Sequence, residues 1–236
     1  IPAPAQFYAE LYREDNGKNT DAVYPDHEEL LNDIANAYRQ VIRDLYDVGC
    51  RNVQFDDCTW GMVCDKKFWE TMVGGGYDVV ELEKTYLRLN NLALENRPAD
   101  MAVNTHVCRG NYHSTYAAEG AYDNVAKFLF AQENVDGFYL EFDDHRSGGF
   151  EPLKYVAPGK KVALGLITTK SPVLEDKQTV IDRIHQAAQY VPLDRLCLCP
   201  QCGFASCEIG NKLTEEEQWA KVKLVCDIAK EVWKDF

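Results

Sequence analysis

The fold class follows from one stretch, Asn52-Val53-Gln54-Phe55-Asp56-Asp57, which alternates apolar and polar side chains as a short β-strand does. An amphipathic helix pattern precedes it directly. Apolar residues recur at three- and four-residue steps from Leu30 to Leu45, and Gly49 ends the pattern. A helix that leads at once into a strand is half of a βαβ unit, so the stretch predicts a parallel sheet covered by helices.

The same alternation continues along the rest of the chain. Further strands are predicted at 101–106, 137–142, 161–167 and 195–199, with a weaker one at 1–8. Helical patterns cover 77–96, 124–132 and 178–190, and a last helix opens with a capping box at Thr214-Glu215-Glu216-Glu217 and runs through Val232.

Six βα units in 236 residues compare with eight in the about 250 residues of a TIM-type barrel. We therefore expect an α/β fold, a (β/α)8 TIM-type barrel that lacks its first two βα units in this chain. A doubly wound open sheet, which is complete with five or six strands, is the alternative. No linker-like shift in composition divides the chain, so 1–236 is expected to form a single domain.

Composition and charge restrict the function further. The 25 Lys and Arg against 38 Asp and Glu leave a net charge of −13, which argues against a nucleic acid or an anionic membrane as partner. No apolar run is long enough to span a membrane, and the chain does not begin with a signal-peptide pattern. Nine cysteines, an odd number in a long chain, indicate reduced thiols and a cytoplasmic protein.

Side chains that bind metals follow the predicted strands. Asp56 and Asp57 end the first strand, His106 and Cys108 end the next, Glu141 ends a third with Asp143 and Asp144 just beyond it, and Cys199 and Cys202 mark the end of the last. In either parallel architecture the carboxyl ends of the strands meet at one edge, where functional side chains gather. Imidazole, thiolate and carboxylate are the ligand types that zinc favours, so the sequence predicts a zinc site there.

Two other interpretations of the last cysteines remain open at this point. Cys199-x-x-Cys202 is also the spacing of a redox pair, and with Cys197 and Cys207 it could form a structural four-cysteine zinc site. The remaining thiols are interpreted as structural: Cys50, Cys58, Cys64 and Cys226.

Four motifs, taken together, resemble a known family. They are Val53–Asp57, Asn104–Asn111, Phe138–Phe142 and Pro200–Gly203. In this order they resemble the zinc-binding C-terminal barrel of cobalamin-independent methionine synthase, and more closely its short single-barrel relatives.

The resemblance implies a site and a reaction. It implies that the four Zn²⁺ ligands are His106, Cys108, Glu141 and Cys202. It also implies that the Asp56 carboxylate binds the amino group of homocysteine. The implied enzyme is a methyltransferase that moves a methyl group from a methyltetrahydrofolate to homocysteine, giving methionine, through a zinc-activated thiolate. The family's pterin-stacking tryptophan would fall near Ala5-Gln6-Phe7, where this chain has none.

Other roles and functions remain open beside this one. The same metal could serve an S-alkyltransferase that joins an epoxide to coenzyme M, or the barrel could be non-catalytic with a structural zinc. Glu141 is the exchangeable ligand, because thiolates bind zinc more firmly than a carboxylate does. Arg109 and Arg146 could bind a substrate carboxylate or orient nearby carboxylates, and an oligomer or partner chain could complete the barrel.

Overall fold

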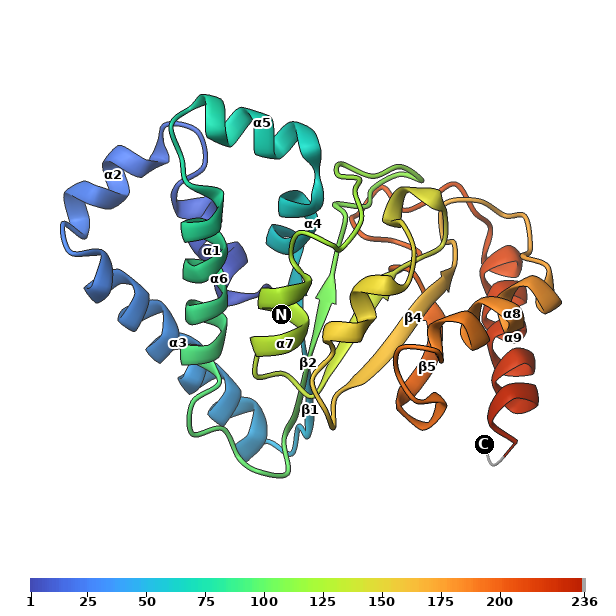
Figure 1. Cartoon of the computed structure of the whole chain (residues 1–236). Helices are drawn as coiled ribbons and strands as arrows, with labels where there is room; N and C mark the ends of the chain where they lie inside the picture. The colour runs from blue at the N-terminus through green and yellow to red at the C-terminus, as the bar shows by residue number, and fades with distance from the viewer. Residues whose placement is uncertain (235–236) are drawn as a thin grey trace.

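The computed structural model describes residues 1–234 and contains one five-stranded parallel sheet (Figure 1). The strands follow one another in chain order across the sheet: β1 (Asn52–Asp57), β2 (Ala102–Val107), β3 (Gly137–Glu141), β4 (Lys161–Ile167) and β5 (Leu196–Pro200). A doubly wound sheet reverses its strand order at a switch point, and this sheet does not reverse. The order is consistent with a TIM-type barrel, and closure of that barrel stays a prediction.

Nine α-helices and three short 3₁₀ turns connect the strands within residues 1–234 (Figure 1). The helices are α1 (Pro4–Leu11), α2 (Asn16–Val23), α3 (His27–Asp47), α4 (Cys58–Cys64), α5 (Lys66–Gly74), α6 (Val79–Ala93), α7 (Ala126–Gln132), α8 (Lys177–Ala187) and α9 (Glu215–Trp233). The 3₁₀ turns are η1 (His145–Ser147), η2 (Glu151–Tyr155) and η3 (Leu193–Arg195). The described helices include none that is both long and apolar enough to cross a membrane.

The two faces of the sheet differ in polarity. Along β1 the apolar Val53 and Phe55 are buried in the core under the helices, whereas Asn52, Gln54 and Asp56 on the other face are exposed. The alternation that predicted the strand therefore separates a helix-covered face from an open one. In a closed barrel the open face would be the interior.

The N-terminal segment corrects one prediction. Residues 1–8 were expected as a strand, but only Pro2 pairs with the sheet, through a bridge to Asp56 of β1. The chain then turns into α1, because Pro4 occupies the first helical position, where its missing N–H costs nothing. The Ala5 N–H donates to the Asn90 side chain of α6, which fixes α1 against the core.

Most predicted elements are present with ends that differ by a few residues, and the capping box of α9 forms between Thr214 and Glu217. Besides α1, three helices were not predicted: α2, α4 and α5. The two helices after β1 position the site, because α4 begins at Cys58 directly after the last strand residue. Asp57 is both that last residue and the N-cap of α4, accepting from the Thr59 N–H.

Candidate metal centre

Four predicted ligands come together at the carboxyl edge of the sheet. His106 is in β2 and Cys108 follows it, Glu141 is the last residue of β3, and Cys202 lies just beyond β5. Their ligand atoms all lie within 4.8 Å of one another. Within residues 1–234 this is the only such group of three or more His, Cys, Asp or Glu side chains, so Cys197, Cys199 and Cys207 do not form the alternative four-cysteine site.

The group is shielded from solvent and contains a polar atom without a partner. His106, Cys108 and Glu141 are buried and Cys202 is half-buried. The Nε2 atom of His106 is buried with no hydrogen-bond partner and lies 4.0 Å from Oε1 of Glu141. Because a buried imidazole nitrogen needs a partner, and the other three groups are metal ligands, the donor set fits a metal ion with mixed sulfur, nitrogen and oxygen coordination.

Electrostatic coupling within the group favours anionic sulfur. Hydrogen bonds from the Cys202 and Cys58 thiols, together with the neighbouring imidazole, hold the pKa of Cys108 well below its ordinary value. Burial lowers the pKa of His106, but its hydrogen bond to Cys108 and the charges of Cys108 and Glu141 outweigh burial and raise it to about 9. These surroundings favour the thiolate form of Cys108, the form in which a cysteine binds a metal.

Glu141 is held on both carboxylate oxygens. Oε1 accepts from the Arg109 backbone N–H at 2.9 Å and from Asn111 Nδ2 at 2.6 Å, while Oε2 accepts from Arg146 Nη2 at 2.5 Å. The Tyr122 hydroxyl accepts from the Glu141 N–H at 3.0 Å and donates to its carbonyl at 3.3 Å. Main chain and carboxylate are thus fixed before any metal arrives.

Asp56 lies beside the group on the open face. Parallel pairing of β1 and β2 places it opposite His106, and its side chain is exposed. A carboxylate in this position can receive a cation that approaches from the open face.

Several residues near the group make contacts that differ from those expected from the sequence. Cys58, interpreted as a structural thiol, hydrogen-bonds to Cys108, because β1 and β2 run in register and Cys58 directly follows β1. The Arg109 guanidinium is fully buried, 4.5 Å from the Tyr122 ring centroid, so it cannot reach a substrate carboxylate. Asn111 is the last residue of the Asn104–Asn111 motif, but its contact with Glu141 was not predicted. Arg146, expected to bind a substrate carboxylate or to orient nearby carboxylates, contacts the Glu141 carboxylate.

Cys199, which lies in β5, and the two histidines His113 and His145 have separate positions. Cys199 lies outside the metal-binding group, and burial raises its pKa to about 12, which makes a redox pair with Cys202 unfavourable. His113 contacts the Gly210 carbonyl oxygen at 3.4 Å, and His145 begins η1.

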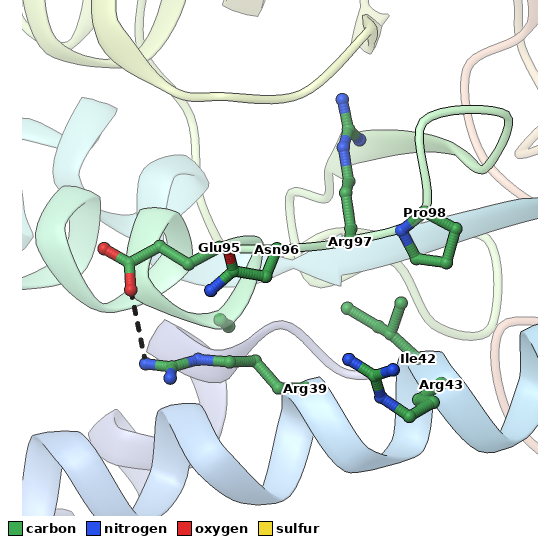
Figure 2. A pocket seen from close by; sticks show the side chains of 8 residues that line it. Arg39, Ile42, Arg43, Glu95, Asn96, Arg97 and Pro98 are labelled. Carbon is green, nitrogen blue, oxygen red and sulfur yellow. Dashed lines mark ion pairs between the residues drawn. The ribbon is translucent and has the colours of Figure 1, made fainter.

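A separate cavity of about 220 Å³ lies at the opposite end of the strands (Figure 2). Arg39 and Arg43 of α3 and Arg97 before β2 line it. Arg39 turns toward Glu95, at 3.6 Å, and Arg97 points away from α3 (Figure 2). The three guanidinium groups therefore do not converge on a common ligand position.

Comparison with known proteins gives one family. Residues 23–231 match the family model described as the cobalamin-independent synthase catalytic domain. The chain is 45% identical over 236 residues to the uncharacterized protein YxjH of Bacillus subtilis (strain 168), covering 99% of this chain and 61% of that protein.

Two solved structures are similar to this chain. A putative vitamin-B12-independent methionine synthase from Listeria monocytogenes aligns with a TM-score of 0.74 and 39% identity, over 99% of this chain and 63% of that one. A B12-independent methionine synthase from Shewanella sp. W3-18-1, in complex with selenomethionine, aligns with a TM-score of 0.61 and 20% identity, over 90% of this chain and 57% of that one. The chain thus spans about three fifths of the length of these relatives.

Proposed function

The chain belongs to the cobalamin-independent synthase family through its catalytic domain, and from this premise we propose that it is a zinc-dependent methyltransferase. The acceptor is the thiol of homocysteine, the donor is a methyltetrahydrofolate, and the product is methionine. One observation carries the proposal: two thiols, an imidazole and a carboxylate converge at one sheet edge, and the imidazole has a buried nitrogen without a partner.

His106, Cys108, Glu141 and Cys202 would hold the metal. A zinc ion in this set would lower the pKa of an incoming thiol and present its sulfur as a thiolate. Cys108 and Cys202 supply the firm anionic contacts and His106 a neutral nitrogen, while the carboxylate of Glu141 is the weakest of the four donors. Glu141 is therefore the side chain that gives up its position to the substrate thiol. A reducing cytoplasm would keep both cysteines available.

Asp56 would orient the substrate. Its exposed carboxylate lies opposite His106, so it can bind the ammonium group of an amino-acid thiol whose sulfur points into the cluster. This gives the site a preference for homocysteine over a simple alkyl thiol. The Shewanella relative was solved with selenomethionine, the selenium analogue of the expected product, which supports the same substrate class.

The first experiment tests the metal. Purified protein should hold one zinc per chain, and X-ray absorption should give two sulfur neighbours at about 2.3 Å and two nitrogen or oxygen neighbours at about 2.0–2.2 Å. Cys108→Ser and Cys202→Ser should lose the metal, whereas the matched control Cys199→Ser should keep it. An all-sulfur shell, or loss of zinc from the control, would disprove the mixed site.

The second experiment tests the reaction. Zinc-loaded protein with homocysteine and a methyltetrahydrofolate should produce methionine. If methionine forms only from another methyl donor, homocysteine stays the proposed acceptor and the methyltetrahydrofolate is wrong as the donor. A thioether formed from an epoxide and coenzyme M would favour the S-alkyltransferase. If the protein binds zinc but no thiol, and shows no turnover with any donor, the zinc is structural and the barrel non-catalytic.

A further inference from the structure

Arg146 contacts the Glu141 carboxylate at the oxygen that faces away from His106. Nη2 of Arg146 lies 2.5 Å from Oε2, whereas Oε1 is the oxygen nearer His106. Both side chains are essentially inaccessible to solvent, at 1% and 0%. The ion pair is therefore dry, and the Glu141 charge depends on Arg146 for its neutralisation.

Other charges hold Arg146 in this position. Its Nη1 lies 3.0 Å from Asp143 and also pairs with Asp144, and its guanidinium lies 4.5 Å from the Tyr116 ring centroid. Lys170 pairs with the far oxygen of Asp143. The guanidinium cannot swing away without breaking these contacts, so it offers Glu141 a fixed cation.

We propose that Arg146 is the positioning residue that receives the Glu141 carboxylate when a substrate thiol takes its place among His106, Cys108 and Cys202. The inference rests on the proposed function, because it assigns a partner to Glu141 in the exchange of donors described there. Partners for the displaced carboxylate are already in place, because Oε2 accepts from Arg146 and Oε1 accepts from the Arg109 N–H and the Asn111 amide.

The charges explain why the exchange needs Arg146. While the carboxylate contacts a metal cation, its charge is neutralised even without Arg146. Once the thiol has displaced it, the carboxylate is a fully buried anion whose cationic contact is Arg146. Removing that cation penalises the displaced position much more than the original one. Arg146 thus sets how readily Glu141 makes room for the thiol.

Two affinities separate this role from a merely structural one. Zinc affinity is measured by competition with a chelator, and homocysteine affinity by the sulfur-to-metal charge-transfer absorption of the cobalt(II)-substituted protein. Arg146→Gln should leave zinc affinity unchanged or tighter and weaken homocysteine binding by about tenfold or more, as expected for loss of a charge-assisted hydrogen bond. The control is Arg195→Gln, since Arg195 donates to the Ala157 and Lys160 carbonyls ahead of β4, at the opposite end of the strands, and should affect neither affinity.

A double-mutant cycle completes the test. In a Glu141→Gln background the side chain at 141 is neutral, so Arg146→Gln should no longer change homocysteine affinity. If it weakens homocysteine equally in both backgrounds, or weakens zinc and homocysteine by the same factor, the proposal is wrong. If Arg146→Gln does not fold, the same cycle is measured with Arg146→Lys. If Arg146→Lys weakens homocysteine binding as much in the Glu141→Gln background as in the unmodified protein, the proposal is again refuted.

The outcomes also separate this inference from the proposed function. If the unmodified protein shows no spectral change with homocysteine, the proposed function fails and this inference fails with it. If the unmodified protein responds to homocysteine and Arg146→Gln responds with the same affinity, only the role of Arg146 is refuted.

Discussion

Gly61 of α4 is the point at which a single methyl group should disturb the metal centre. A Cβ atom built on Gly61 would lie 2.1 Å from the carbonyl oxygen of Cys108 and 3.1 Å from its carbonyl carbon. Real Cβ atoms essentially never approach another heavy atom within 3.0 Å, so in Gly61→Ala the helix and the Cys108 backbone must separate by about 0.9 Å. No flexible side chain is available to give way, because both sides of the contact are main chain.

The magnitude has two parts. Overpacking of this kind costs about 1–3 kcal/mol, and the better helix propensity of alanine returns about 1 kcal/mol, so the free energy of unfolding should fall by up to about 2 kcal/mol. The effect on the metal should be larger, because ligand distances are tolerated only within about 0.2 Å. A displaced Cys108 should weaken zinc binding by more than about tenfold.

The assay compares Gly61→Ala with Gly74→Ala, which is also helical, at the end of α5, but has open space around its added Cβ. The control should bind zinc like the unmodified protein and be stabilised by up to about 1 kcal/mol. Urea unfolding of the metal-free proteins gives stability, and chelator competition gives zinc affinity. If Gly61→Ala binds zinc as tightly as Gly74→Ala, the close packing of α4 on Cys108 does not position the ligand, and the reasoning fails.

Three further predictions concern other groups. Burial, together with the charge of Asp57, raises the pKa of Glu133 to about 8. The folded chain therefore keeps a proton that the unfolded chain releases near pH 4.5, and the free energy of unfolding falls between these values by up to about 1.4 kcal/mol per pH unit. Glu133→Gln should remove this part of the decline in urea unfolding at pH 5.5 and 7.5, and an unchanged slope would contradict it. Cys58→Ala removes a hydrogen bond to Cys108 but no ligand, so metal analysis should still find one zinc; a metal-free variant would make Cys58 a ligand. Asp56→Asn should raise the KM for homocysteine in the methyl-transfer assay but not that for mercaptobutanoate, which lacks the amino group, and equal effects on both would argue against an ammonium contact.

The strands and their ends could be predicted because they depend on local sequence. Alternation of apolar and polar residues locates β1, and a parallel sheet brings the carboxyl ends of its strands to one edge whatever the loops do. That is why His, Cys and carboxylate side chains could be expected together at one edge, whereas the choice of His106, Cys108, Glu141 and Cys202 among them came from the resemblance to the family.

The helices after β1 could not be predicted in the same way. The β1 pattern runs into α4 without a loop, and Gly61 within α4 resembles a helix breaker in sequence. Glycine is required at this position by tertiary packing, since only a residue without a side chain fits against the Cys108 carbonyl. The N-terminal error is of another kind: residues 1–8 were expected as a weak strand despite Pro2 and Pro4, and Pro4 starts a helix there.

The supports of the site depend on side-chain reach, which sequence spacing does not encode. Arg146 lies five residues after Glu141 and could contact a substrate, solvent or another carboxylate with equal plausibility from its position in the chain. The η1 turn determines which group Arg146 contacts. Asp144 caps this turn and accepts from the Arg146 N–H at 3.0 Å, which directs the guanidinium back to Glu141. The four candidate metal ligands are thus placed at the strand ends, whereas Arg146, the residue proposed to receive Glu141, is placed by a short turn. Variants in η1 should accordingly change the handling of the thiol while the metal stays bound.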